Sequence, residues 1–344
     1  MVLGGISAST QAEIDLHLHS NISDGVQADD HLVELVMQAG VAVAAVTDHD
    51  SIASALDPTL VARLRALGAQ APRFVPGVEF TCWLDTPIRP GCRQEVHVVG
   101  LGCNPYQPAL QAALSRQRLS AIARIRTCVA RLNADGYPLR FAEVGFAAAR
   151  QGLHKWHIGK ALAAHGYAGS AEVAVKTLVS PRFPKPEAGT TTALLTPAQA
   201  ILLIRAAGGV AVLAHPQRNV PANDPAAATD LLVSFKMHGL DAVEVYRVDL
   251  PATERPMYEK VAQSLGLLLS GGTDYHGAGD TGGPRFPGDA HAPLSLWAPL
   301  EALIHARGGV TDVCDVAPKS LLHANAAERL LLGNVQRRRR DSAP

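Results

Sequence analysis

Short apolar runs that end in polar residues recur along the chain, and each run has the length of a β-strand. The run from Val41 to Val46 contains only Val and Ala and stops abruptly at the polar segment 47–50. A continuous apolar run of this length is typical of a parallel strand that is buried on both faces. The same pattern predicts seven strands, at 14–19, 41–46, 74–79, 95–101, 209–214, 242–246 and 267–270.

Helical patterns lie between several of these strands, with clear examples at 28–39 and 56–67. The alternation of strand, polar tip and helix predicts a (β/α) barrel or a doubly wound sheet. Both folds place their functional residues at the carboxyl ends of the strands. The polar tips are therefore where a functional site is expected.

The segment from Pro105 to Pro197 departs from this alternation, because it has little strand pattern. It contains a long helical stretch at about 109–135 and a second one at 154–165, followed by a Pro-rich link. We predict a helical insertion between two halves of one barrel. The predicted parts are a first half at 1–104, the insertion at 105–197, a second half at 198–335 and a basic, solvated tail at 336–344.

Charge and cysteine usage exclude several classes of protein. The 31 basic and 31 acidic residues give a formal net charge of zero, so the chain has no overall charge for binding nucleic acid or an anionic membrane. Five Cys without a CxxC pair argue against a disulfide framework and a thiolate zinc site. Residues 1–13 predict no signal peptide, and no apolar run could span a bilayer. We expect a cytoplasmic protein without membrane contact or an obligate protein partner.

Two histidines one residue apart, His17 and His19, have the spacing of half a metal site. On a strand they point to the same face, and Ile14, Leu16 and Leu18 supply the opposite, apolar face. Because the chain contains 14 His, this spacing can also arise by chance, and the pair alone is a weak indication.

The other predicted strand ends add more imidazoles and carboxylates. Ligands of this kind suit Mn, Fe or Zn rather than soft, thiolate-bound metals. Nine such residues are too many for one ion, and they fit two or three divalent ions. The set is His17, His19, Asp24, His49, Glu79, His97, His215, Asp274 and His276.

The order of the motifs HxH, Asp24, TDHD, GxE, HxxG, AHP and GGTDYHG resembles the polymerase-and-histidinol-phosphatase (PHP) family of metallophosphoesterases. Within it, the chain is most similar to stand-alone bacterial enzymes that act on 3′,5′-nucleoside bisphosphates and on short RNA 5′ ends. The resemblance implies a distorted, seven-stranded (β/α) TIM-like barrel with a helical insertion domain. It also implies two or three metal ions at the carboxyl ends of the strands.

The resemblance implies a role for each residue of the set. One ion would take His17, His19, Glu79 and Asp274; a second would take Glu79, His97 and His215; a third would take Asp24, His49 and His276. A metal-bound hydroxide held by Glu79, Asp274 and His215 would attack the phosphate ester in line.

Carboxylates next to the ligands are expected to support them. Asp15 precedes the first ligand pair, and Asp48 and Asp50 flank His49. The carboxylates at 48 and 50 either orient His49 or cap the helix that follows around Ser51. The sequence favours neither of these two interpretations.

Candidate substrate-binding residues lie in the predicted insertion. Arg116 and Arg124 could face a phosphate, and the alternative is that they are solvent-facing charges. Lys155, Trp156 and His157 stand where the resembled enzymes have Arg-Pro-His, which implies a grip on a second phosphate. Lys keeps the positive charge but lacks the bidentate fork of Arg. Trp156 either stacks on a base or belongs to the core.

Two departures from the resembled enzymes concern substrate choice: a long loop between Glu79 and His97, and Pro184-Lys185-Pro186 in place of a Gly-Lys-Pro stretch. The sequence predicts a metal-dependent phosphoesterase that removes the 3′-phosphate of 3′,5′-nucleoside bisphosphates, with 5′–3′ trimming of short RNA as a further activity. One alternative is a phosphatase for histidinol phosphate or another small phosphomonoester. Another is a metal-binding scaffold without catalysis.

Overall fold

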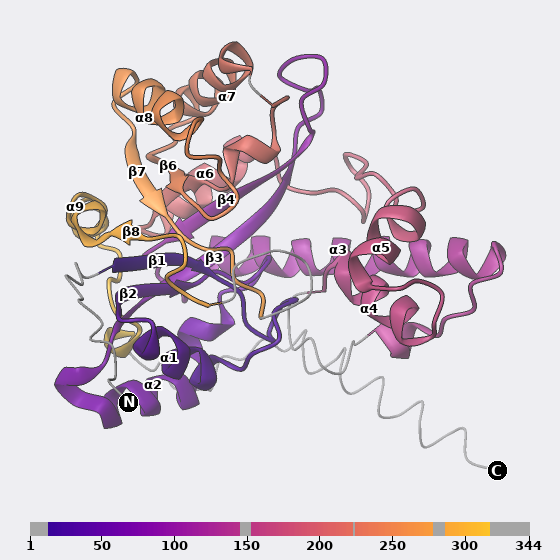
Figure 1. The fold of residues 1–344 in the computed structure, drawn as a ribbon, viewed down its shortest axis with the longest axis horizontal. Coiled ribbons are helices and arrows are strands. Elements are labelled where there is room, and N and C mark those ends of the chain that lie inside the picture. Colours follow the sequence, from indigo (N-terminus) through magenta and orange to yellow (C-terminus); the bar gives the residue numbers. More distant parts are fainter. Residues whose placement is uncertain (1–12, 145–152, 223, 278–285, 317–344) are drawn as a thin grey trace, which may run out of the picture.

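The computed structural model describes residues 13–144, 153–222, 224–277 and 286–316. Its strands form one nearly closed barrel in the order β7-β6-β5-β4-β3-β2-β1-β8, with helices packed around it (Figure 1). The predicted basic tail at 336–344 lies outside the described residues, as do residues 1–12, where no signal peptide is predicted. No helix among the described residues is long and apolar enough to cross a membrane.

The seven predicted strands are confirmed, and the structure adds a two-residue eighth strand that is too short to leave a pattern in the sequence. β3 is longer than predicted because it continues as a hairpin with β4, in which Trp83 pairs with Glu95. The strands are β1 (Glu13–Leu18), β2 (Val41–Val46), β3 (Arg73–Trp83), β4 (Glu95–Leu101), β5 (Val210–Leu213), β6 (Ala242–Tyr246), β7 (Leu268–Gly271) and β8 (Ala292–Pro293).

The barrel is distorted because β4 runs antiparallel to both of its neighbours, β3 and β5. The pairs β1–β2, β2–β3, β5–β6 and β6–β7 are parallel. The reversal corrects one expectation, since His97 lies near the amino end of its strand and not at the carboxyl end. It pairs with Thr81, beyond the carboxylate of Glu79, so the reversed strand still delivers His97 to the same rim of the barrel.

The barrel closes where the segment after β7 runs beside β1. The backbone N–H of Asp274 donates to the carbonyl oxygen of His17 at 2.8 Å, and the N–H of His19 donates to that of Tyr275 at 2.9 Å. The closing contacts therefore join two segments that carry candidate ligands.

Within the described ranges, six helices cover the barrel, and local signals explain where several of them begin. Asp57 caps one helix by accepting a hydrogen bond from the N–H of Thr59, with Pro58 in its first turn. Thr196 and Gln199 form a reciprocal capping box on another helix. The six are α1 (Asp29–Gln38), α2 (Pro58–Leu67), α6 (Pro197–Ala206), α7 (Pro225–Met237), α8 (Arg255–Ser264) and α9 (Trp297–Ala306).

An apolar cluster inside the barrel lies next to the candidate ligands, on the same faces of β3 and β4. Val75 of β3 belongs to this cluster, and Glu79 lies on the same face of the strand because side chains alternate. On β4 the same alternation places Val99 and Leu101 in the cluster and His97 in line with them. The rigid apolar layer thus fixes the strands that carry the polar residues.

The predicted insertion projects from one side of the barrel (Figure 1). Its helices are α3 (Pro108–Ala134), α4 (Lys155–Ala164) and α5 (Ala171–Ala174). These helices have a core of their own, in which Cys128 of α3 packs with Ile158 and Leu162 of α4. The first part of α3 contributes Leu110 to the main core instead. This helix is therefore shared by the two cores, and the boundary at residue 105 stays a prediction.

Candidate metal centre

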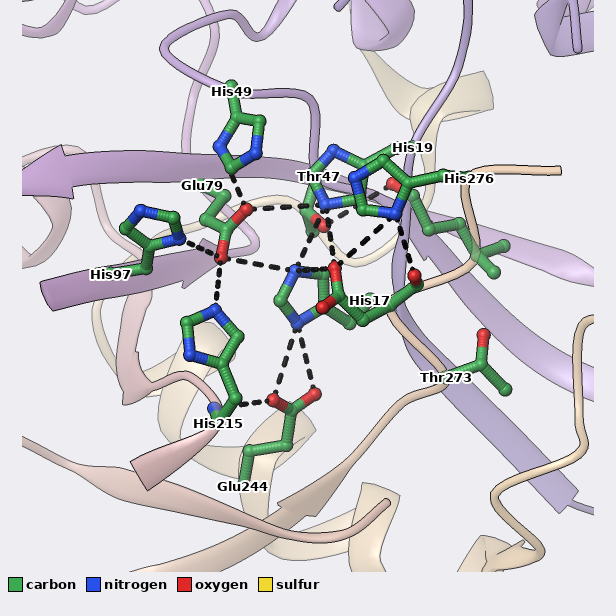
Figure 2. A network of polar contacts seen from close by, with 12 residues as sticks. His17, His19, Thr47, His49, Glu79, His97, His215, Glu244, Thr273 and His276 are labelled. Atoms are coloured by element: carbon green, nitrogen blue, oxygen red, sulfur yellow. Dashed lines mark hydrogen bonds and ion pairs between the residues drawn. The ribbon is translucent and has the colours of Figure 1, made fainter. Parts of the chain in front are cut away.

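The structure brings all nine predicted ligands together at one rim of the barrel, with the carboxylate of Glu79 in the middle. Imidazole rings from several strands and loops surround this carboxylate (Figure 2). The nearest ring nitrogens lie 3.3 Å away in His17, 3.2 Å in His19, 3.0 Å in His49, 3.0 Å in His97 and 3.1 Å in His215.

Three overlapping groups of side chains have the composition of metal sites. The first group matches the residues expected on the first ion. His49 takes part in both other groups, so the second and third expected sites adjoin at this ring. The groups are His17, His19, Glu79 and Asp274; His49, Glu79 and His97; and His19, Asp24, His49 and His276.

Several buried polar atoms in these groups lack hydrogen-bond partners. They include both carboxylate oxygens of Asp24, one oxygen of Glu79 and Nδ1 of His49; Nδ1 of His215, which lies beside Glu79 but in none of the three groups, also lacks one. Buried polar atoms are almost always hydrogen-bonded, because leaving one unpaired costs about 1–3 kcal/mol. Divalent cations would satisfy these atoms together, so the residues present fit a metal centre.

The carboxylates of the centre stay ionised despite their burial. Burial alone would raise the pKa of Asp24, but the facing His276 and His49 hold it well below its usual range. Burial also raises the pKa of Glu79. The surrounding histidines, beginning with His17, lower it by more, so this pKa lies well below its usual range. Burial lowers the pKa of His215 to about 4, so its imidazole is neutral. Burial alone would lower the pKa of His49, but Glu79 and Asp24 raise it to about 10, so this ring is protonated until a metal ion takes the place of the proton.

Backbone strain is concentrated at this rim. Four non-Gly residues among those described have a positive φ, and three of them lie at the site: Asp50 at 50°, His215 at 31° and Asp274 at 59°. Left-handed backbone at a non-Gly residue costs about 1–3 kcal/mol. The backbone at Gly272 also packs tightly against His17: a Cβ atom at this position would collide with the His17 side chain, so the site requires glycine here.

Glu244 and Arg247 form a layer beneath the ligands that the sequence did not reveal. Glu244 lies 3.1 Å from Nδ1 of His17, which leaves Nε2 of that ring facing Glu79 (Figure 2). Glu244 also accepts hydrogen bonds from the backbone of His215 at 2.9 Å and from Arg247 at 2.7 Å. The sequence feature that could have identified Glu244 is a carboxylate in the middle of an otherwise apolar predicted strand.

The expected supporting carboxylates hold backbone segments and loops in place. Asp15 accepts hydrogen bonds from the backbone and hydroxyl of Thr273, at 2.9 and 2.7 Å, next to the candidate ligand Asp274. Asp48 accepts hydrogen bonds from three hydroxyls, those of Ser20, Ser23 and Ser54. Asp48 therefore fastens the loop after β1 to the turn after β2.

Asp50 turns away from the ligands toward the hairpin and the insertion. Its carboxylate accepts hydrogen bonds from the N–H of Thr81 at 3.1 Å and from the amide of Gln117 at 3.0 Å. This contact links the tip of β2 with β3 and α3.

Two of the predicted substrate-binding residues lie beside the centre. Arg124 and Lys155 line a small cavity of about 20 Å³ together with His49. Lys155 Nζ lies 2.8 Å from a carboxylate oxygen of Glu95, and a guanidinium nitrogen of Arg124 lies 3.8 Å from the other oxygen. The ring of Phe183 packs against the Arg124 guanidinium.

The other three predicted substrate-binding residues lie elsewhere. Arg116 lines a separate hollow of about 660 Å³ with Trp83. His157 is buried and contacts the carbonyl oxygen of Ser23 through Nε2 at 3.1 Å. Trp156 is partly buried and does not line either hollow. The larger hollow is lined by none of the nine candidate ligands, whereas the small cavity has His49 in its wall.

No family model matches the chain, but individual proteins of named activity are similar to it. The chain is 27% identical over 297 residues to the 3′,5′-nucleoside bisphosphate phosphatase of Chromobacterium violaceum. The aligned region covers 85% of this chain and 98% of the relative. It is 31% identical over 274 residues to the 5′–3′ exoribonuclease Rnm of Salmonella typhimurium, covering 76% and 84% of the two chains.

A solved structure from Bifidobacterium adolescentis, described as a metal-dependent phosphoesterase, has the same fold. It superposes with a TM-score of 0.67 at 24% identity and covers 86% of this chain and 97% of its own. Fold, site and relatives together define a metal-dependent phosphoric ester hydrolase. The chain belongs to the polymerase-and-histidinol-phosphatase (PHP) family.

Proposed function

We propose that this enzyme removes the 3′-phosphate of 3′,5′-nucleoside bisphosphates. The observation that carries the proposal is the pair of cations, Arg124 and Lys155, in a cavity that also has His49 in its wall. A bisphosphate needs a second anion site next to the reacting phosphate. The cavity of about 20 Å³ has room for about one water molecule, so Arg124 and Lys155 would form this site only when their side chains move apart around the phosphate. The similarity to a nucleoside bisphosphate phosphatase along 98% of that relative supports the same substrate class.

We further propose that the nine clustered residues hold two or three divalent ions, with Mn, Fe and Zn as the candidates. When bound, these ions would supply Lewis-acid charge that neutralises the phosphate and makes a water molecule acidic enough to act as the nucleophile. Glu79 contacts the largest number of rings and is the natural bridging ligand. Glu244 keeps His17 in the tautomer whose Nε2 is free to bind.

The role of the cavity is to grip the phosphate that is not cleaved. Arg124 and Lys155 face two carboxylates in the cavity wall, Glu95 and Asp50, so the attraction for a phosphate comes from the position of the two cations and not from an excess of positive charge. Both cations are largely buried, so the attraction for a phosphate is screened less than at an open surface. Glu95 holds the two side chains in position before the substrate arrives.

A chromatographic assay with Mn²⁺ tests the proposal against its alternatives. The substrates are 3′-phosphoadenosine 5′-phosphate, AMP, histidinol phosphate and a short 5′-phosphorylated RNA. We expect the bisphosphate to be converted to AMP and phosphate with the highest kcat/KM. A preference for histidinol phosphate would refute the assignment, and bound metal without turnover of any substrate would indicate a scaffold.

Trimming of the RNA from its 5′ end is a second candidate activity. It is favoured by the 31% identity to an exoribonuclease and by a separate hollow of about 660 Å³ near the insertion. That hollow is lined by Trp83 and Arg116, which are a stacking surface and a cation for a further nucleotide. Release of 5′-mononucleotides from the RNA in the same assay would establish this activity.

Substitution of Arg124 by Met is expected to raise KM for the bisphosphate about 10–100-fold, since a charge-assisted contact to phosphate contributes about 1.5–3 kcal/mol. AMP, which lacks the second phosphate, should be affected less. Arg116→Met, on the same helix but outside the small cavity, is the matched control and should leave KM for the bisphosphate unchanged. The reverse outcome for the two variants would move the phosphate grip to the larger hollow.

A further inference from the structure

A tenth histidine, His154, lies against the metal centre although it belongs to the insertion. Its Nδ1 atom is 2.9 Å from Oδ2 of Asp24. Its ring stacks on that of His49, with ring centroids 4.5 Å apart and planes inclined by 27°. Asp24 and His49 are both members of the third group of candidate ligands, so His154 is placed at the edge of that group.

The contact between His154 and Asp24 has the spacing of two ligands on one ion. Both Oδ atoms of Asp24 and the Nδ1 atom of His154 are buried, and the only partners that face them are one another and the neighbouring histidines of the group, with Nδ1 and Oδ2 2.9 Å apart. Two ligand atoms about 2.1 Å from a shared cation at ordinary coordination angles are about 3.0–3.4 Å apart. The other oxygen of Asp24 faces Nε2 of His276 at 3.3 Å, which is inside this range, and the 2.9 Å contact of His154 lies at its short end.

Neighbouring contacts hold His154 in this position. The backbone N–H of His154 donates to Nδ1 of His157 at 3.1 Å, while Nε2 of His157 donates to the carbonyl oxygen of Ser23. Lys160 donates to the carbonyl oxygen of Asp24 at 2.8 Å. His157 and Lys160 thus dock the start of α4 on the loop that carries Asp24, and this docking preorganises His154.

We propose that His154 is a protein ligand of the divalent ion held by Asp24, His49 and His276. The inference rests on the proposed metal assignment and extends it to the insertion. Three of these ligands come from the barrel and the fourth from the insertion, so the ion joins the two parts. Binding of this ion therefore fixes α4 on the barrel, next to the cavity that contains Lys155.

The test is the metal stoichiometry of the full-length protein, measured by equilibrium dialysis against Mn²⁺ with elemental analysis and without any substrate. We expect wild type to bind three equivalents. In His154→Ala, one equivalent should bind at least 10-fold more weakly, while the other two change less than 2-fold. His154→Asp, which restores an oxygen ligand, should recover most of the loss.

Two control variants separate ligation from docking. Lys160→Met removes a contact between insertion and barrel without removing an imidazole, and His165→Ala removes an imidazole at the far end of α4. His165→Ala should keep three equivalents at wild-type affinity, and Lys160→Met, which weakens the docking but keeps the imidazole, should weaken the affected site less than 3-fold. Hydrogen exchange provides a second measurement, since Mn²⁺ should slow the exchange of α4 amides in wild type and both controls but not in His154→Ala.

The proposal is overturned if His154→Ala binds Mn²⁺ like wild type, if wild type binds fewer than three equivalents, or if Lys160→Met shows the same loss. None of these measurements depends on which phosphate ester is cleaved. Failure of the enzyme to hydrolyse a nucleoside bisphosphate would refute the proposed substrate and leave the metal titration valid.

Discussion

Replacement of Glu79 with Gln is expected to lower kcat/KM by about 10³-fold or more, a larger loss than the 10–100-fold typical of residues that only orient a metal ligand. The reason is its position, because its two oxygens face the ring nitrogens of five histidines. An amide keeps the size of the side chain but loses the charge and one acceptor. The far-ultraviolet circular dichroism spectrum should stay unchanged.

The matched control for this variant is Glu244→Gln, which changes the same functional group one layer further out. Glu244 touches His17 and the backbone of His215 but is not a proposed ligand, so the loss should stay within about 10–100-fold. Steady-state kinetics with saturating Mn²⁺ and metal analysis of each variant give the comparison. Wild-type rates in Glu79→Gln, or equal losses in both variants, would contradict a bridging role for Glu79.

Substitution of Arg247 by Met is expected to lower the free energy of unfolding by about 3–5 kcal/mol, the usual result of removing one partner from a buried ion network. The Arg247 side chain is 1% exposed and contacts Glu244, Asp249 and Asp274. Burial alone would lower the pKa of its guanidinium, but these carboxylates raise it, so the group stays charged. Without it, buried carboxylates would face one another unpaired.

Urea denaturation of the metal-free protein measures this effect. Arg218→Met is the control, because Arg218 also pairs with Asp249 and Asp274 but is 41% exposed. Because water reaches the guanidinium of Arg218, its removal should cost less than about half of the loss in Arg247→Met. The explanation fails if the two variants are destabilised equally. Combining Arg247→Met with Glu244→Gln should recover part of the loss, since one unpaired charge is then removed.

The sequence was most informative where strand pattern and ligand chemistry coincide. Apolar runs located the strands, and the polar residues at their tips, such as His49 and Glu79, turned out to meet at one rim. The direction of β4 was not predictable, because an apolar run has the same composition whether the strand is parallel or antiparallel. His97 reaches the centre through pairing with Thr81, which only the register of the hairpin reveals.

Residues of the insertion were harder to place, because no strand fixes them. Arg116 and Arg124 are eight residues apart on one helix, which separates them by about 12 Å along the axis and about 80° around it. Only the second reaches the cavity, where Phe183 from a segment without regular pattern packs against it. His154 escaped notice for the same reason, since its neighbour Asp24 is 130 positions earlier in the chain (154 minus 24).

The left-handed backbone at His215 and Asp274 limits how this enzyme can be made more robust. Glycine at either position would relax the chain, and a search that rewards heat resistance alone would select it. Each such gain would remove a proposed ligand. Thermostable variants of this enzyme should therefore come from the outer helices, and any screen needs metal retention as a second criterion.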